Sequence, residues 1–302
     1  MNNKYLICIL GPTASGKTSL AIETAKYFNT EIISTDSRQF YKEMHIGTAK
    51  PTFEELAEAK HHFIDSLSVK QDYSAGDFEH DALQKLDELY KTKDVVVLAG
   101  GSGLYINAIL FGIDPFPVIE HETRLKTFSI YKEKGIEGLK DELRRLDPEY
   151  YIEVDLDNSR RLMRALEVCY ASGKTYSSFR KQEPKPRNFK VVKIAYDYER
   201  EVLYKRINDR VDLMLQNGLE AEAKTLIEFK DMYALNTIGY KEFFSFFDGE
   251  ISKEEAIELI KRNSRRYAKR QLTWFGHDKE INWIKPNVDL KKLFDLMKLE
   301  ME

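Results

Sequence analysis

The sequence predicts an α/β fold in which helices flank a parallel sheet, with a helical insertion after the third strand. Two observations carry this prediction. Short apolar runs at 5–10, 31–36 and 94–101 alternate with stretches of helical periodicity, as in strands joined by crossover helices. A polar helical stretch at 120–146 has no strong apolar run beside it, which indicates an insertion.

The first strand is predicted at YLICIL (5–10), a short apolar run that ends in Gly-Pro. The apolar spacing of 17–28 predicts a helix after it. EIISTD (31–36) reads as a second buried strand, and it ends on the carboxylate of Asp36.

A third strand follows a capped helix. Ser74 and Asp77 have the spacing of a helix start, and DVVVLAGG (94–101) is β-branched and apolar throughout, as expected for a strand buried on both faces. Ligands of parallel sheets lie beyond the carboxyl ends of the strands. The residues at these ends are Gly11, Asp36 and 100–102.

The insertion consists of two polar helical stretches, 120–134 and 136–146, joined at Gly135. We therefore predict a core domain at 1–115 and 158–302 and a helical insertion domain at 116–157, with 185 as an alternative C-terminal edge. The Pro-rich segment KQEPKPRN (181–188) then leads back to the sheet.

The rest of the chain is mostly helical. A strand is predicted at FKVVKIAYDY (189–198), a helix at 199–216, a long helix ending at RRYAKRQLTWF (265–275), and a last short strand at INWI (281–284).

Composition excludes several classes of protein. The chain has 302 residues and a net charge of −3, so it is not a globally basic nucleic-acid binder. Its two cysteines, Cys8 and Cys169, lack metal-ligand spacing and suit a reducing compartment. We see no signal peptide and no run of apolar residues long enough to span a membrane. A cytoplasmic monomer is the expectation.

The motif GPTASGKT lies between a predicted strand and a predicted helix, which is the context that a phosphate-binding P-loop requires. It makes the fold P-loop NTPase-like. Successive backbone N–H groups and the helix N-terminus favour an anion there. Lys17 can reach a terminal phosphate, and the Thr18 hydroxyl can bind Mg²⁺. The predicted phosphate-binding residues are Gly11, Pro12, Thr13, Ala14, Ser15, Gly16, Lys17 and Thr18.

The loop indicates a polyphosphate without saying which one. A nucleotide hydrolase normally has an Asp at the end of a buried strand to hold Mg²⁺. Here the third strand ends in Ala-Gly-Gly, and its carboxylate, Asp94, lies at the opposite end. No Asn-Lys-x-Asp motif for guanine is present. This argues against a GTPase and more weakly against a motor ATPase, and leaves a small-molecule kinase open.

Asp36 lies on the same predicted sheet edge as the P-loop. It suits a general base, a metal ligand or the cap of a turn, and the residues alone leave these roles open. Ser37, Arg38 and Gln39 follow it, and Arg and Gln are side chains that read base edges and phosphates. A phosphate loop, a carboxylate and base-reading groups in one cleft fit group transfer to a nucleobase.

At this point the sequence resembles a known family. The segments GPTASGKTSLAIE, EIISTDSRQFYKEMHIGTAKP, YSAGDF, AGGSGLY, SRRLMRALEV and RRYAKRQLTWF occur in this order. Together they are similar to the bacterial-type tRNA dimethylallyltransferases, over about residues 5–285. The resemblance implies transfer of a dimethylallyl group from dimethylallyl diphosphate to the exocyclic amine of the adenine just 3′ of the anticodon.

The resemblance also implies roles for individual residues. The P-loop would hold the diphosphate of the donor, with Mg²⁺ between Thr18 and the diphosphate oxygens. Asp36 would accept a proton from the adenine amine, and Arg210 would neutralise the leaving diphosphate. Ser102 stands where the family usually has Thr. The implied tRNA-binding residues are Asp36, Ser37, Arg38, Gln39, Ser102, Arg124, Arg160, Arg161, Leu162, Met163 and Arg164.

Two predicted helices are locally basic. Arg160, Arg161 and Arg164 share one helix face, which is either a solvated surface or a contact for the phosphate backbone of the anticodon stem-loop. The second helix has no acidic residue between Ile260 and Trp274, and its basic residues are Lys261, Arg262, Arg265, Arg266, Lys269 and Arg270. Such a stripe suits an RNA backbone, although some of these residues could pair with acidic neighbours.

The aromatic residues of the second basic helix, Tyr267, Trp274 and Phe275, are expected in the core, with base stacking as the alternative. Three functions therefore compete: a tRNA prenyltransferase, a small-molecule kinase and a non-catalytic RNA-binding ATPase.

Overall fold

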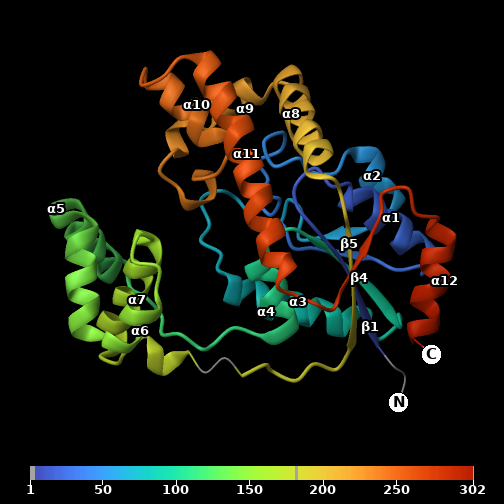
Figure 1. Ribbon diagram of the computed structural model, residues 1–302, viewed down its shortest axis with the longest axis horizontal. Coiled ribbons are helices and arrows are strands. Elements are labelled where there is room, and N and C mark those ends of the chain that lie inside the picture. The colour runs from blue at the N-terminus through green and yellow to red at the C-terminus, as the bar shows by residue number, and fades with distance from the viewer. Residues whose placement is uncertain (1–3, 181–182, 302) are drawn as a thin grey trace. The chain divides into compact units, whose positions relative to one another are not determined.

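The computed structural model describes residues 4–180 and 183–301, and within these ranges it contains one six-stranded sheet. The strands are β1 (Tyr5–Leu10), β2 (Ile32–Ser34), β3 (His61–His62), β4 (Val95–Gly100), β5 (Lys190–Tyr196) and β6 (Ile281–Ile284). Their order is β3-β2-β4-β1-β5-β6, and every neighbouring pair is parallel. Figure 1 labels β1, β4 and β5 of this sheet. The predicted α/β class with a parallel sheet is confirmed.

Alternation along β1 explains its place at the centre of the sheet. Leu6, Cys8 and Leu10 point into one apolar cluster, while Ile7 and Ile9 point into the other. All six residues of β1 are buried, as expected for a strand with helices on both faces.

Different helices cover the two faces. One cluster contains side chains of α3 (Ala75–Leu89), α4 (Gly103–Phe111), α8 (Arg200–Gln216), α9 (Leu219–Thr225), α10 (Tyr240–Phe247) and α11 (Lys253–Gly276). The other contains side chains of α1 (Lys17–Tyr27) and α12 (Leu290–Met301). The short helix α2 (Phe53–Glu58) and the 3₁₀ turns Ile227–Phe229 and Tyr233–Leu235 complete this part of the chain.

The second strand is shorter than predicted. β2 ends at Ser34, whereas the sequence suggested a strand as far as Asp36. The Asp36 carboxylate accepts a hydrogen bond from the backbone N–H of Arg38 at 3.0 Å, which closes a turn directly after the strand. Asp36 therefore lies on a turn at the carboxyl edge of the sheet.

The chain divides into two compact units, Met1–Phe111 with Pro186–Glu302, and Gly112–Lys185. The smaller unit contains α5 (His121–Leu146), α6 (Pro148–Glu153), α7 (Ser159–Ser172) and the 3₁₀ turn Ser177–Phe179. α5 is interrupted at Gly135, whose φ of 64° and ψ of −159° are not helical.

The predicted edge at 157 is too early for this unit. Leu162 and Leu166 of α7 share an apolar core with Leu139 and Leu143 of α5, so α7 belongs to the insertion and not to the sheet domain. The compact unit instead reaches the alternative edge at 185. Within the Pro-rich segment 181–188, Lys181 and Gln182 lie outside the described residues.

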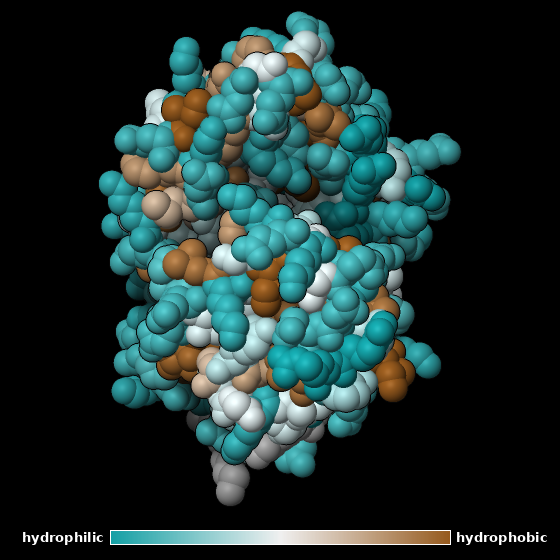
Figure 2. Space-filling view, turned by 90° about the vertical axis from the view of Figure 1, so that its left-hand side faces the viewer, coloured by the Kyte–Doolittle hydropathy of each residue, from teal (hydrophilic) through white to brown (hydrophobic). Residues whose placement is uncertain are grey.

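On the face drawn in Figure 2, hydrophilic side chains predominate and hydrophobic ones are scattered among them. Within the described ranges, every helix is too short or too polar to cross a lipid bilayer.

Candidate functional site

A cavity of about 600 Å³ lies in the larger unit, at the carboxyl edge of the sheet. Its walls include P-loop residues, Asp36 after β2 and Gly100–Gly101 at the end of β4. The structure thus brings together the three predicted strand ends around one space. The loop 45–55, α8 and α11 supply the other walls.

The P-loop joins β1 to α1 through two left-handed residues, Ala14 with a φ of 62° and Gly16 with a φ of 85°. Gly16 is the N-cap of α1 and offers no side-chain cap, so the first N–H groups of the helix stay available for an anion. The buried Ser15 hydroxyl oxygen also has no hydrogen-bond partner among the described residues. These features fit a phosphate-binding loop.

Lys17 is the ammonium group of this loop. Its Nζ donates a hydrogen bond to the Pro12 carbonyl oxygen at 2.7 Å. Burial and then the nearby charge of Arg210 lower the pKa of Lys17 to about 8, while Asp36 opposes the shift. Lys17 and Arg210 are therefore two neighbouring like charges, and a bound diphosphate would neutralise them.

This pKa gives a prediction for the pH dependence of diphosphate binding. A protonated Lys17 attracts a diphosphate, so the affinity for a diphosphate monoester should be constant below about pH 8 and fall above it as free Lys17 loses its proton. Calorimetry from pH 6.5 to 9.5 should also show proton uptake on binding near the upper end. A flat affinity profile would contradict the assignment of Lys17 to the diphosphate.

Two arginines of α8 reach the P-loop from successive turns of the helix. Arg206 Nε donates to the Ala14 carbonyl oxygen at 2.9 Å, and Arg210 donates to Thr13 Oγ1 at 3.5 Å. Burial and then Arg206 lower the pKa of Arg210, and Asp36 raises it. Arg206 was not among the residues predicted from the sequence, although its four-residue spacing from Arg210 could have indicated it.

Asp36 has one carboxylate oxygen in its turn and one outside it. Oδ1 accepts the N–H of Arg38, whereas Oδ2 has no hydrogen-bond partner in the described part of the chain. The Asp36 charge influences the pKa values of both Lys17 and Arg210, which places the carboxylate near the phosphate-binding groups. This arrangement suits a proton acceptor beside an anion site.

Ser102 and Tyr267 lie next to Asp36. Ser102 Oγ accepts the backbone N–H of Ser37 at 3.4 Å. Burial and then the charge of Asp36 raise the pKa of Tyr267, and a hydrogen bond with Ser102 opposes the rise. Tyr267, which the sequence suggested as a core residue, is instead part of the cavity lining.

Arg38 and Gln39 already have protein partners. Arg38 donates to the Tyr233 carbonyl oxygen at 3.3 Å and lies 4.9 Å from the centroid of the Tyr233 ring. The amide nitrogen of Gln39 donates to the carbonyl oxygens of Thr48 at 3.2 Å and Ala49 at 3.1 Å. Both amide hydrogens of Gln39 thus hold the neighbouring loop, while its side chain also borders the cavity.

Gln271 of α11 links two walls of the cavity and was also missed in the sequence. Its Oε1 accepts the N–H of Thr13 at 2.9 Å, and its Nε2 donates to the Gly101 carbonyl oxygen at 2.8 Å. The sequence pattern that could have indicated Gln271 is its position one helical turn after Tyr267. Gly101 makes this contact possible, because a Cβ there would lie 2.3 Å from Gln271 Nε2 and 3.0 Å from the Gly11 carbonyl oxygen.

The substitution Gly101→Ala should therefore weaken the P-loop. It displaces Gln271 and leaves the Thr13 N–H unpaired, at a cost of about 1–3 kcal/mol. The melting temperature and the affinity for pyrophosphate should both fall. Gly76→Ala is the matched control, because the nearest atom to its added Cβ is Ser74 Oγ at 3.5 Å. Equal behaviour of the two variants would show that Gln271 does not hold the loop.

The remaining predicted tRNA-binding residues lie in the smaller unit. Arg124, Arg160, Arg161 and Arg164 are exposed. Arg164 is 3.6 Å from Glu167 and lies over the Phe116 ring. The Leu162 side chain is fully buried in the core of the unit, so the predicted contact of this residue with RNA would have to involve its backbone. Met163 is half-buried against the same core.

The basic stripe of α11 is partly neutralised. Lys261 pairs with Asp212 at 2.6 Å, and Arg265 donates to Asn208 at 2.6 Å. Its four exposed cations are Arg262, Arg266, Lys269 and Arg270. Among the aromatic residues, Phe275 is buried as predicted, whereas Trp274 is 46% exposed, so its assignment to the core is wrong.

Comparisons with known proteins agree with the resemblance. The model of the family "IPP transferase" matches residues 39–278. A tRNA dimethylallyltransferase of Christiangramia forsetii is 54% identical over 97% of both chains, and one of Flavobacterium johnsoniae is 49% identical over 96% of both.

Solved structures are similar as well. The full-length tRNA isopentenylpyrophosphate transferase of Bacillus halodurans has a TM-score of 0.72 and 36% identity, covering 99% of this chain and 97% of that one. A eukaryotic dimethylallyltransferase acting on tRNA has a TM-score of 0.78 and 26% identity, covering 99% of this chain and 77% of that one.

Proposed function

The chain belongs to the IPP transferase family and is a tRNA prenyltransferase, and from that premise we propose the following reaction. The enzyme transfers the dimethylallyl group from dimethylallyl diphosphate to the exocyclic amine of the adenine immediately 3′ of the anticodon, and releases diphosphate. The observation that carries the proposal is the shared cavity, in which a phosphate loop faces the available carboxylate oxygen of Asp36.

Asp36 is the general base of this reaction. The lone pair of an exocyclic adenine amine is delocalised into the ring, so this amine is a weak nucleophile. A bond forms between the amine nitrogen and C1 of the dimethylallyl group as the bond from C1 to the diphosphate oxygen breaks. Asp36 Oδ2 then accepts the proton that the nitrogen loses. The free position of this oxygen, outside the turn, supports the role.

The leaving diphosphate gains negative charge as the bond breaks. Three kinds of group at the P-loop stabilise this charge electrostatically: the Lys17 ammonium, the Arg210 guanidinium and the first N–H groups of α1. Arg206 and Gln271 do not need to touch the diphosphate, because they hold the backbone of Ala14 and Thr13 in place.

The residues present also fit Mg²⁺. The described residues contain no cluster of three or more His, Cys, Asp or Glu that could hold a metal alone. Mg²⁺ commonly binds through few protein ligands together with substrate phosphates and waters. We propose that Thr18 holds it with the diphosphate oxygens. The ion would supply further neutralisation of the leaving group.

The tRNA would be bound through phosphate contacts with its anticodon stem-loop. Two sets of exposed basic residues suit such contacts, Arg160, Arg161 and Arg164 on α7, and Arg262, Arg266, Lys269 and Arg270 on α11. The target base must leave its stack to reach Asp36, which costs a few kcal/mol. Such a substrate implies a cytoplasmic enzyme, and we expect a monomer.

A small-molecule kinase with the same loop is the alternative. Incubating the protein with Mg²⁺ and undermodified tRNA, once with labelled dimethylallyl diphosphate and once with γ-labelled ATP, separates the two. We expect label in the tRNA from the first donor only. Transfer of phosphate from ATP, with no prenyl label in the tRNA, would contradict the proposal.

A further inference from the structure

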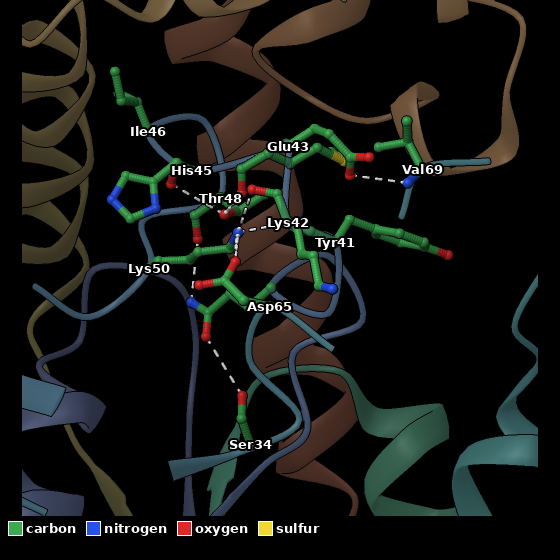
Figure 3. Close-up of polar contacts among 12 residues, drawn as sticks. Ser34, Tyr41, Lys42, Glu43, His45, Ile46, Thr48, Lys50, Asp65 and Val69 are labelled. Carbon is green, nitrogen blue, oxygen red and sulfur yellow. Dashed lines mark hydrogen bonds and ion pairs between the residues drawn. The ribbon is translucent and has the colours of Figure 1, made fainter. Parts of the chain in front are cut away.

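The loop at 45–51 forms one wall of the cavity, yet it has little regular structure of its own. His45, Ile46, Thr48, Ala49, Lys50 and Pro51 all line the cavity. Figure 3 shows this loop with the polar side chains around it. Because a loop without strand or helix partners depends on side chains for its position, the groups that hold it also set the shape of the reaction space.

The Glu222 carboxylate of α9 accepts hydrogen bonds from three successive backbone N–H groups of this loop. Oε2 accepts from His45 at 3.0 Å and Ile46 at 2.7 Å, while Oε1 accepts from Gly47 at 3.0 Å. The Tyr240 hydroxyl donates a fourth bond to Oε1 at 2.6 Å. Both carboxylate oxygens are thus occupied, and Glu222 is not part of the cavity lining.

The fit around this anchor is close. Tyr240 is fully buried, and a Cβ on Gly47 would lie 2.6 Å from its ring. The backbone of the loop therefore rests on the aromatic ring while Glu222 fixes it by hydrogen bonds. Movement of either group would move the loop.

The opposite side of the loop leads to Asp36. Gln39 donates to the carbonyl oxygens of Thr48 and Ala49, and its own N–H donates to the Asp36 carbonyl oxygen at 3.2 Å. A chain of hydrogen bonds thus runs from Glu222 through the loop and Gln39 to the turn that carries the proposed base. Lys50 adds support at the end of the loop by donating to the Tyr41 carbonyl oxygen at 2.6 Å and pairing with Asp65.

We propose that Glu222 is a positioning residue for prenyl transfer, acting through the loop 45–51 and Gln39 on the cavity wall and on Asp36. The proposal rests on the proposed function. Glu222 has no contact with the P-loop, so its loss should affect the transfer step and spare diphosphate binding.

The variant Glu222→Gln tests this, because it keeps the size of the side chain but replaces one acceptor oxygen with a donor. We expect kcat for prenyl transfer to fall by about 10- to 100-fold, since small misplacement of reacting groups has effects of this size. The affinity for pyrophosphate should stay within about threefold, and hydrogen exchange at the amides of 45–47 should speed up.

Two further variants sharpen the result. Tyr240→Phe removes one of the four donors and keeps the ring, so its effect should be smaller and in the same direction. Glu220→Gln is the matched control, because Glu220 lies on the same helix and pairs with Lys253 at 2.5 Å, away from the loop. It should behave as the unchanged protein.

Three outcomes would overturn the proposal. One is a folded Glu222→Gln protein with kcat within twofold of the unchanged protein. Another is a parallel loss of kcat and pyrophosphate affinity, which would mark Glu222 as a residue of general stability. The third is that the unchanged protein transfers no prenyl group. This result would contradict the proposed function itself, and measuring the unchanged protein beside the variants distinguishes it from the first two outcomes.

Discussion

Replacing Asp36 with Asn should lower the rate of prenyl transfer by about 10³-fold, because general-base catalysis typically contributes 10²- to 10⁴-fold. The amide can still accept the N–H of Arg38 through its oxygen, so the turn after β2 should survive. The affinity for tRNA should therefore stay within a few-fold. Single-turnover transfer to tRNA and a binding titration measure the two effects separately.

Asp94→Asn is the matched control for this prediction. Asp94 precedes β4 at the opposite edge of the sheet and pairs with Lys4 at 2.9 Å on the surface. Its loss should leave the transfer rate unchanged. An Asp36→Asn protein with a near-normal rate would remove Asp36 from the role of base.

Replacing Arg210 with Met should lower kcat by about 10²- to 10³-fold, the usual loss when one group that stabilises transition-state charge is removed. Arg210 donates to Thr13 of the P-loop, where the proposed mechanism has the leaving diphosphate. Since that charge develops as the bond breaks, kcat should fall more than the affinity for dimethylallyl diphosphate. Single-turnover rates at saturating donor, beside calorimetric binding, provide the measurement.

Lys205→Met offers a comparison on the same helix. Lys205 is exposed and forms an ion pair with Asp209 at 2.8 Å, and such pairs contribute about 0–1 kcal/mol. If Arg210→Met weakened donor binding and kcat to the same extent, Arg210 would be a residue of ground-state binding only.

Local sequence patterns were sufficient for five of the six described strands and for the P-loop. They did not predict β3, which consists only of His61 and His62. The apolar runs of β1 and β4 are continuous because helices cover both faces, and the capping pair Ser74 and Asp77 marks the start of α3 as expected. The kink at Gly135 was also visible, because glycine separates two periodic stretches.

The C-terminal edge of the insertion could not be predicted from local sequence patterns. α7 carries an apolar face and a basic face, and either domain could have used the apolar face. Only its packing against Leu139 and Leu143 of α5 decides the question in favour of the smaller unit. Local periodicity predicts that a helix has a buried side but does not say which partner buries it.

The same reasoning explains the parts of the site that the sequence did not show. The P-loop, Asp36 and Arg210 belong to motifs or to a resemblance. Arg206, Gln271 and Glu222 instead form hydrogen bonds to backbone groups that are far away in the sequence. Gln271 and Thr13 are 258 positions apart in the chain. Helical spacing from Arg210 and Tyr267 could have indicated Arg206 and Gln271, but it does not identify their partners, because these contacts exist only after the fold brings the two segments together.

The position of the new bond tests the central claim most directly. An anticodon stem-loop RNA is incubated with enzyme, Mg²⁺ and dimethylallyl diphosphate, beside a second RNA in which guanine replaces the adenine 3′ of the anticodon. We expect mass spectrometry to find one dimethylallyl group on the exocyclic nitrogen of that adenine, one diphosphate released per group transferred, and no modification of the second RNA. Equal modification of both RNAs, or no modification of either, would contradict the account.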